Sequence, residues 1–579
     1  MAGRRPAVPH VALVCIALLA AACAPASPPG SPGAASGAPS ASAAAGLGSP
    51  TASASAGGPA PSCPPAVGVA PPPPPLGQPG WWANRVFYEA FVRSFVDSNG
   101  DGNGDLRGLI SRLDYLNDGN PATKTDLGVT GLWLMPILPS PSYHGYDVTD
   151  YRSVNPDYGS LADLRTLVRE AHRRGIAVIL DMPFNHTSSQ DPWFKDSLTP
   201  GSAHADWYVW SSTPGGSNWF PSGKRFYYAA FGPDLPDLNY RDPAVTTAID
   251  SVASFWLDDV GVDGFRLDAA KYIVEDGAQT QNTPETHAWL SAFRAKAEAG
   301  APGALLLGEV WDTSATSASY VPNDLDMTFD FGLSGAYVAA ANGGQAWGLA
   351  GILSRVTALY PADGFGTFLT NHDMDRLANQ VNEDPARMRL AAGLLLTGPG
   401  VPFIYYGEEI GMSGAKPDER IRTPMRWNAS SPSAGFTTGT PWESLSTDAT
   451  GVDVADESVD PGSLLSEYRV LVALRAAHPA LSQGSTVVAQ SSNGAVLATI
   501  RQAPGETLLV LANLGSTPVS GESVSLAGGS LCGTPTAHVV YGPQATLPAP
   551  AIGPTGGLQP YAPIPTLAPD SVTVIGFGS

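Results

Sequence analysis

Cysteine is scarce in this chain of 579 residues, which contains only four. Cys15 and Cys23 belong to an N-terminal leader, so Cys63 and Cys532 are the two that remain in the mature chain. In an oxidising compartment these two could pair, and two free thiols are the alternative.

Basic residues are also few, with 31 Lys and Arg against 52 Asp and Glu. The formal net charge of −21 argues against nucleic acid and anionic lipid as partners, because both carry negative charge. A neutral polymer meets no such objection.

The N-terminal hydrophobic run, residues 11–20, is too short to span a membrane as a mature helix. It follows Arg4 and Arg5, and residues 1–23 are typical of a signal peptide. The sequence Ala-Ala-Ala-Cys at 20–23 resembles a lipoprotein processing site, although Leu19 lies one place earlier than in the usual pattern. We expect an extracellular protein that a lipid on Cys23 anchors to the outer face of the cytoplasmic membrane; cleavage by ordinary signal peptidase is the alternative.

Residues 24–80 consist almost entirely of Ala, Pro, Ser and Gly and include five consecutive prolines at 71–75. Such a segment has too little apolar side-chain area to offset the entropy of ordering, so we expect a flexible, locally extended tether. It would hold the domains that follow, at 81–480 and 481–579, clear of a membrane surface.

Four predicted buried strands end in polar side chains. In residues 261–271, strand alternation sends Arg266 and Asp268 to one face and their apolar neighbours to the other. A guanidinium beside a carboxylate favours the ionised form that a nucleophile needs, although an ordinary surface ion pair would have the same local sequence. Three other apolar runs end in the same manner, at residues 181–186, at Glu309 and at residues 371–373.

Strands and helices alternate along the folded part of the chain. Helical patterns cover residues 161–171 and 244–258, among others. Strands are predicted at 86–91, 131–136, 177–181, 264–268, 305–309, 325–331, 366–369 and 401–405. This α/β pattern predicts a (β/α)8 TIM barrel, in which active sites lie at the C-terminal ends of the strands.

The four strand ends resemble the conserved motifs of the α-amylase family, glycoside hydrolase family 13, and the resemblance extends from about Trp81 to the C-terminus. It implies that Asp268 is the nucleophile, Glu309 the general acid/base and Asp373 a carboxylate that orients the substrate. Arg266, His186 and His372 match family positions that contact the nucleophile or the sugar. A carbohydrate-binding surface protein without catalysis is a further hypothesis, against which the intact carboxylates argue.

Retaining hydrolysis of glycosides explains these residue types. Two carboxyl groups about 5–5.5 Å apart are needed, one to attack the anomeric carbon and one to protonate the leaving oxygen. We therefore expect a raised pKa for Glu309, through desolvation and nearby negative charges, and an Asp268 that Arg266 keeps ionised.

A long aromatic-rich segment, residues 187–236, follows the third strand without a helical period. The resemblance implies an inserted B domain that walls one side of the cleft. Its aromatic residues could stack on sugars, but for most of them we favour packing of the insertion's own core. Beyond a helical run at 464–477, short β-like stretches at 495–500, 508–511 and 571–575 predict a C-terminal β-sandwich at 481–579.

Residues 97–105 place oxygen ligands at alternate positions among glycines, which suits a hard cation such as Ca²⁺. Gly108 stands where an EF-hand carries its last glutamate, so an EF-hand is not supported. The segment resembles the calcium loop after the first strand in oligo-1,6-glucosidase-like members, and a metal-free loop of Asx turns is the alternative. The implied ligands are Asp97, Asn99, Asp101, Asn103 through its carbonyl, and Asp105.

Substrate choice depends on residues 144–150 and on Arg422. The resemblance places Tyr146 where the family stacks an aromatic ring on the sugar, and Asp147 where exo-acting α-glucosidases pair an aspartate with an arginine, which Arg422 could supply. Other motifs resemble a group intermediate between oligo-1,6-glucosidases and neopullulanases that includes secreted α-amylases. We favour a monomeric α-amylase acting on α-glucans such as starch, with an exo-acting α-glucosidase or a 4-α-glucanotransferase as alternatives.

Overall fold

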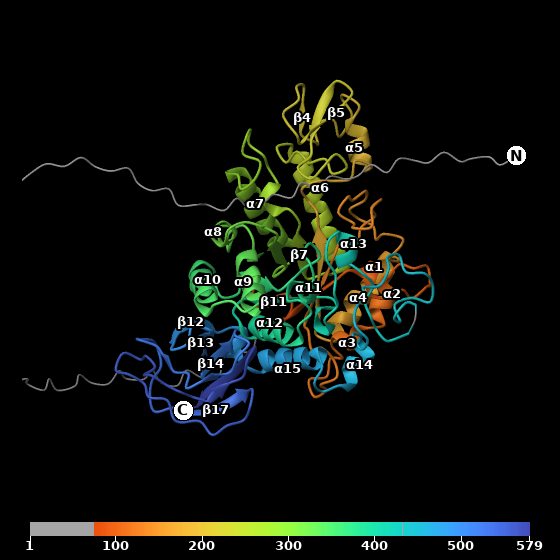
Figure 1. Cartoon of the computed structure of the whole chain (residues 1–579). Helices are drawn as coiled ribbons and strands as arrows, with labels where there is room; N and C mark the ends of the chain where they lie inside the picture. The colour runs from red at the N-terminus through yellow and green to blue at the C-terminus, as the bar shows by residue number, and fades with distance from the viewer. Residues whose placement is uncertain (1–73, 431, 579) are drawn as a thin grey trace, which may run out of the picture. The chain divides into compact units, whose positions relative to one another are not determined.

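The computed structural model describes residues 74–430 and 432–578, and at its centre eight parallel strands close into a barrel. Around the barrel the strands follow the order β1-β11-β10-β9-β8-β7-β3-β2, and Figure 1 labels β7 and β11 among them. Each of the eight predicted strands is present, so the predicted (β/α)8 barrel is confirmed. Its strands are β1 (Phe87–Ala90), β2 (Gly131–Leu134), β3 (Ala177–Met182), β7 (Gly264–Leu267), β8 (Leu305–Gly308), β9 (Met327–Phe329), β10 (Phe365–Phe368) and β11 (Val401–Tyr405).

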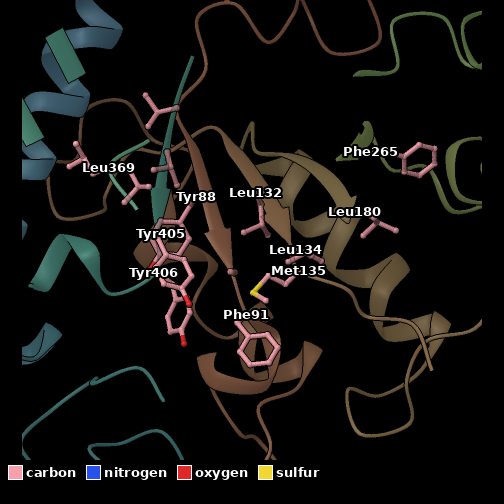
Figure 2. Close-up of a cluster of buried hydrophobic side chains, with 14 of the residues drawn as sticks. Tyr88, Phe91, Leu132, Leu134, Met135, Leu180, Phe265, Leu369, Tyr405 and Tyr406 are labelled. Carbon is pink, nitrogen blue, oxygen red and sulfur yellow. The ribbon is translucent and has the colours of Figure 1, made fainter. Parts of the chain in front are cut away.

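Alternation along the strands divides the core into two layers. Within β2, Trp133 belongs to the cluster inside the barrel, whereas Leu132 and Leu134 belong to the cluster that packs against the helices. The outer layer includes Tyr88, and Figure 2 shows it with Leu132 and Leu134. All four residues of β2 are buried, as expected for a parallel strand covered on both faces.

The larger helices begin at strong capping residues. Ser160 forms a reciprocal capping box with Asp163 at the start of α4 (Leu161–Arg173), which confirms the helix predicted from residue 161. Asp242 caps α6 (Pro243–Ser254), which continues as the π-helix η1 (Phe255–Val260). The other barrel elements are α1 (Val92–Phe95), α2 (Leu106–Ile110), α3 (Leu113–Leu116), η2 (Ala270–Tyr272), α7 (Pro284–Gly300), α8 (Ser314–Ala318), α9 (Phe331–Ala341), α10 (Ala346–Leu359), α11 (Leu377–Gln380), α12 (Pro385–Thr397), η3 (Glu408–Ile410) and α13 (Asp418–Ile421).

The segment after β3 holds a short helix and a small antiparallel sheet. The helix α5 (Pro192–Ser197) precedes β4 (Trp210–Ser211), β5 (Trp219–Ser222) and β6 (Arg225–Tyr228), in the order β4-β6-β5. Phe194 packs edge-on against Tyr208, with ring centroids 4.9 Å apart, and Trp193 packs against Trp207 at 5.0 Å. These contacts support the interpretation that most aromatic residues here pack the insertion's own core.

The C-terminal part of the chain is an antiparallel sheet domain. Six strands follow the order β16-β12-β13-β14-β19-β17, and β15 pairs with β18. Helices α14 (Val454–Val459), α15 (Leu464–Ala477) and α16 (Pro479–Ser482) precede it. Its strands are β12 (Ser485–Ser491), β13 (Val496–Ala503), β14 (Glu506–Asn513), β15 (Val519–Ser520), β16 (Val524–Ser525), β17 (Thr536–Tyr541), β18 (Thr566–Leu567) and β19 (Ser571–Gly578).

Two buried arginines connect this sheet and α15 to the C-terminal end of α12. Arg475 on α15 donates hydrogen bonds to the carbonyl oxygens of Leu396 (3.1 Å) and Gly398 (2.8 Å). Arg501 on β13 donates to the carbonyl oxygen of Thr397 (2.8 Å). Carbonyls at the end of a helix lack intrahelical partners, so the two guanidinium groups satisfy acceptors that burial would otherwise leave unpaired.

The signal peptide, the processing site at Cys23, residues 24–73 of the tether and Cys63 lie outside the described residues. Within the described residues, no helix combines the length and apolar character needed to cross a membrane.

Candidate active site

A single buried guanidinium joins the C-terminal ends of three neighbouring strands. One terminal nitrogen of Arg266 on β7, Nη1, donates to Oδ1 of Asp268 (2.7 Å) and to Oδ1 of Asp181 (2.8 Å). Its other terminal nitrogen, Nη2, lies 3.0 Å from Oε2 of Glu309, the residue after β8. Only 1% of the Arg266 side chain is exposed, so little water screens these contacts. The strand order β3-β7-β8 thus brings the predicted nucleophile and the predicted acid to one cation.

Asp268 is less acidic than its arginine neighbour predicts. Burial raises the pKa of Asp268 to about 6, and the charge of Asp181 adds to this rise, whereas Arg266 lowers it. Arg266 acts in the expected direction, toward the ionised form of Asp268, but burial at this strand end outweighs its effect on the pKa. With a pKa of about 6, the carboxylate is still mostly ionised at neutral pH.

Glu309 has the protonation behaviour expected of a general acid. Burial raises the pKa of Glu309, Arg266 opposes the rise, and the negative charges of Asp268 and Asp373 add to it. Its Oε2 also accepts a hydrogen bond from the backbone N–H of Ala269 (3.1 Å), which orients it toward the nucleophile's loop. The predicted direction of this shift is confirmed.

The third carboxyl group, Asp373, lies beside two cations. Burial acts to raise the pKa of Asp373, but the charges of His372 and Arg422 lower it below the usual value. His372 Nε2 is 3.2 Å from Oδ2 of Asp373, and Arg422 Nη2 is 3.0 Å from Oδ1. Asp373 is therefore an anion under conditions in which Glu309 holds a proton, and the two carboxyl groups are suited to different tasks.

Glu89 on β1 fixes the orientation of the His372 ring. The Nδ1 atom of His372 is 2.6 Å from Oε1 of Glu89, and its Nε2 is 2.7 Å from the hydroxyl of Tyr146. Burial acts to lower the pKa of His372, but Asp373 and Glu89 raise it above the usual value. The Tyr146 ring stacks on His372 with centroids 5.6 Å apart, so each ring restrains the orientation of the other.

His186 lies at the end of β3 with 2% of its surface exposed. Burial lowers the pKa of His186 to about 4, so its ring is neutral. Its Nε2 has no hydrogen-bond partner within the described part of the chain. A neutral ring nitrogen of this kind can bind a sugar hydroxyl without adding charge to the site.

Asp147 and Arg422, which correspond to a pair in exo-acting α-glucosidases, have different partners in this structure. Arg422 instead bonds to Asp373 and to Oδ2 of Asp418 (3.2 Å), which lies one helical turn before it. Asp147 accepts hydrogen bonds from the hydroxyl groups of Ser140 and Ser142. Arg422 thus meets two carboxylates of its own, one of them that of Asp373, and a shared grip of Asp147 and Arg422 on a sugar stays a prediction.

The loop after α1 contains Asx turns, the feature of the metal-free alternative for residues 97–105. The carboxylate of Asp97 accepts from the backbone N–H of Gly102 (2.8 Å), and that of Asp105 accepts from Ser98 (2.8 Å) while capping α2. All of the proposed ligands are oxygen donors, which suits Ca²⁺. Within residues 74–430 and 432–578, no group of three or more His, Cys, Asp or Glu side chains is arranged to hold a metal ion. Calcium at this loop stays a prediction.

A second set of buried oxygens lies next to His186. Oδ1 of Asn185, Oδ2 of Asp237 and Oε1 of Glu275 each lack a hydrogen-bond partner among the described residues. Burial and the neighbouring charge of Glu275 raise the pKa of Asp237 well above its usual value. Asp237 and Glu275 can share a proton, and neither was predicted from the sequence as a site residue.

Two acidic residues of the site also escaped prediction as site residues, Glu89 and Asp181. Each is 1% exposed within an otherwise apolar barrel strand. Asp181 accepts hydrogen bonds from Arg266, from the indole N–H of Trp133 (3.2 Å) and from the hydroxyl of Tyr146 (3.1 Å). The signal that could have found both is a lone carboxylate in a strand that is otherwise fully buried.

Comparisons with known proteins agree with this geometry. The family model described as "Alpha amylase, catalytic domain" matches residues 89–484. The chain is 38% identical over 442 residues to Alpha-amylase 3 of Dictyoglomus thermophilum, covering 75% of this chain and 85% of that protein. It is 35% identical over 508 residues to the trehalose synthase/amylase of Mycobacterium tuberculosis, covering 76% and 83%. Among solved structures, an α-amylase from H. orenii matches with a TM-score of 0.73 and 37% identity, covering 85% of this chain and 99% of that one.

Proposed function

Because the chain belongs to the α-amylase family of retaining glycoside hydrolases, we propose that it is an α-amylase that cleaves internal α-1,4-glucosidic bonds of starch and maltooligosaccharides. The observation that carries this proposal is the group of three carboxyl groups around Arg266 and His372. Glu309 holds a proton more tightly than usual, while Asp373 holds one less tightly. A double displacement requires a protonated acid, for which Glu309 is suited, and an ionised nucleophile, which Asp268 is for the most part at neutral pH.

In the first step, Asp268 Oδ attacks the anomeric carbon and the bond to the leaving oxygen breaks. Glu309 gives its proton to that oxygen, so a covalent glycosyl-enzyme and a free sugar hydroxyl result. Arg266 bonds to both carboxyl groups and disperses the negative charge that remains on Glu309.

In the second step, Glu309 takes a proton from water as the water oxygen attacks the anomeric carbon. The bond to Asp268 breaks, and the sugar leaves with the configuration of the substrate. Asp373, His372 and His186 line the same centre and supply hydrogen bonds to ring hydroxyl groups that strengthen as the ring flattens.

Arg422 distinguishes this proposal from exo-acting hydrolysis. In the resemblance to α-glucosidases, an aspartate at position 147 and an arginine grip the terminal sugar. Here Arg422 bonds to Asp373 and Asp418. Because these carboxylates hold Arg422, a clamp with Asp147 on a terminal sugar is not preformed, which favours internal cleavage.

Transfer of the glycosyl group to a second sugar, in place of hydrolysis, is the other candidate function, and one observation favours it. The relative from M. tuberculosis carries the name trehalose synthase/amylase, and it spans 76% of this chain. An acceptor sugar in place of water at the second step would use the same three carboxyl groups.

One time course separates these functions. A maltoheptaoside blocked at its non-reducing end is incubated with the purified protein, and the products are followed by chromatography. Early release of internal fragments supports the α-amylase. Inertness of the blocked substrate, with hydrolysis of the unblocked one, indicates an exo-acting glucosidase, and products longer than the substrate indicate transfer.

We also propose that the protein is exported and anchored through a lipid on Cys23, on the basis of the leader and of residues 20–23. Metabolic labelling with a fatty acid tests this. Label in the wild-type protein, lost in Cys23→Ser, is the expected result; an unlabelled protein released into the medium would contradict it.

Calcium at residues 97–105 is a separate proposal, supported by the oxygen-only donor set at alternate positions of the loop. A chelator should lower the melting temperature of the wild-type protein by several degrees, because a cation bound only to the folded state stabilises it. Asp101→Ala should remove that response, and a wild-type melting temperature indifferent to chelator would contradict the proposal.

A further inference from the structure

Three phenylalanine and tryptophan side chains are exposed in the described part of the chain, and two of them border the catalytic centre. Phe231 contacts the ring of His186, with centroids 5.5 Å apart. Trp311 follows Glu309 by two residues, and its carbonyl oxygen accepts a hydrogen bond from Lys271 (2.7 Å). The third, Trp347, is the most exposed at 76% and lies in the first turn of α10, in the outer ring of helices (Figure 1).

The surroundings of Trp347 leave its ring uncovered. Helix neighbours at three and four positions share a face, and here the residues at those positions along α10 are Ala350 and Gly351, while the turn before the helix contains Gly343 and Gly344. A Cβ added at Gly343, Gly348 or Gly351 would meet no atom within 4 Å. The indole therefore has small residues beside it on α10, and a flat molecule can reach the face of the ring.

The platform around Trp347 is also uncharged. Residues 331–354 contain no Asp, Glu, Lys, Arg or His, in a chain whose formal net charge is −21. Gln345, two residues before Trp347, is exposed and makes no capping hydrogen bond with its side chain. The loop before β13 lies alongside, since the Ala346 N–H donates to the carbonyl oxygen of Gly494 (3.0 Å).

A full indole in water is costly, because tryptophan is among the side chains with the most apolar area to bury. A neutral sugar ring has apolar C–H faces that can stack on the indole. Its polar edges suit the uncharged surroundings of Trp347. A glucose unit of an α-glucan has this chemistry. A charged peptide or an anionic surface gains nothing from a platform without charges.

We propose that Trp347 is the platform of a second α-glucan-binding site, which holds a polymer on the outside of the barrel. The proposal rests on the proposed function, since the ligand is the same polymer that the catalytic centre cleaves. The ring stacks on the face of a glucose unit, and Gln345 binds its hydroxyl groups. Polymer chains much longer than the catalytic cleft can then contact the protein at two places, which raises their apparent affinity.

The test uses native gels that contain amylopectin and proteins that also carry Asp268→Asn, so that the polymer is not digested. Retardation is compared for the parent, for Trp347→Ala and Trp347→Phe, and for Val459→Ala, a control at an apolar position with 83% exposure. Loss of the ring should weaken polymer binding about 3- to 10-fold, the range for one stacking contact. The phenylalanine variant and the control should stay within twofold of the parent.

Hydrolysis of maltoheptaose by the active protein separates the two proposals. Wild type and Trp347→Ala should have kcat/KM values within twofold of each other, because this short substrate is handled by the catalytic centre. A parent that amylopectin does not retard, or a Trp347→Ala variant retarded as strongly as the parent, would refute the second site. So would a change in oligomeric state on removal of the ring, which would identify the surface as a self-contact. A wild type inert on maltoheptaose would instead refute the proposed function.

Discussion

Arg266 and Arg475 are equally buried, at 1% exposure, yet their surroundings are opposite. Burial alone would lower the pKa of Arg266, but the carboxylates of Asp181, Glu309 and Asp268 raise it well above the usual value. Burial and, to a smaller extent, the charge of the nearby Arg501 lower the pKa of Arg475 to about 9, and its hydrogen-bond acceptors are backbone carbonyls.

The difference shows what a buried charge does in each place. Carboxylates change protonation during a reaction, so a guanidinium among them can tune and share that charge. Carbonyl oxygens do not titrate, so a guanidinium among them only satisfies the end of a helix. Arg266 belongs to the chemistry and Arg475 to the fold, and substitutions at or around them should separate activity from stability.

The largest effect is expected at the nucleophile that Arg266 holds. Asp268→Asn removes the attacking oxygen while preserving size and hydrogen-bonding capacity, so kcat should fall about 10⁴-fold or more. Circular dichroism and the melting temperature should match the wild type. Near-normal hydrolysis by the folded variant would break the assignment of this region to catalysis.

Removal of Arg266 itself should have the next largest effect on activity. Arg266→Met leaves Asp181, Asp268 and Glu309 without their shared cation, which should raise the pKa of Asp268 and protonate it at neutral pH. We expect kcat to fall about 10²- to 10³-fold, with a loss of about 3–5 kcal/mol in the free energy of unfolding.

Arg266→Lys keeps the charge and provides the control if the methionine variant does not fold. Its kcat should lie between those of the wild type and the methionine variant, with the acid limb of its pH profile moved upward. An unchanged pH profile would show that Arg266 does not act on Asp268.

The pH dependence of the wild type follows from the two shifted carboxyl groups. Asp268 must be ionised to attack, and its pKa is about 6, so kcat/KM should fall about tenfold per unit as the pH drops below 6. Glu309 must be protonated, and its raised pKa extends activity toward higher pH than an ordinary glutamate allows. Full activity maintained down to pH 4 would contradict the burial effect on Asp268.

The smallest effect on activity is expected at the carbonyl-bound arginines. Arg475→Met should lower the free energy of unfolding by about 1–3 kcal/mol, because the carbonyls at the end of α12 lose their donors. Measured well below the melting temperature, its kcat should stay within twofold of the wild type. A large loss of kcat in a folded Arg475→Met protein would erase the distinction between the two arginines.

Sequence periodicity predicted the barrel well, because a parallel strand that is covered on both faces appears in the sequence as a run of apolar residues. The run that became β3 is apolar from Ala177 to Leu180 and then polar at Asp181, and β7 and β8 are similar. Strands of the C-terminal sheet were harder to recognise. β12 lies near the edge of its sheet with mostly exposed residues, and β17 is an edge strand, so neither needs an apolar run.

The residues of the site could be predicted from the sequence, but the ion-pair partners and the burial of these residues could not. Asp268, Glu309 and Asp373 follow strands whose ends must meet, so topology alone brings them together. The partner of Arg422 depends on which of several carboxylates a long side chain reaches, and residues 373 and 418 lie far apart in the sequence. The pKa of Asp268 depends on burial by segments from the whole barrel, which no local pattern records.

The most direct test of the central claim is to identify the residue that bonds to the sugar. Glu309→Gln protein is incubated with a 5-fluoro-α-glucosyl fluoride, whose leaving group needs no acid, and its peptides are analysed by mass spectrometry. If Asp268 is the nucleophile, we expect a stoichiometric glycosyl adduct on the peptide that contains Asp268. This adduct should be absent when Asp268→Asn is also present. An adduct on Asp373 or on another residue would contradict it.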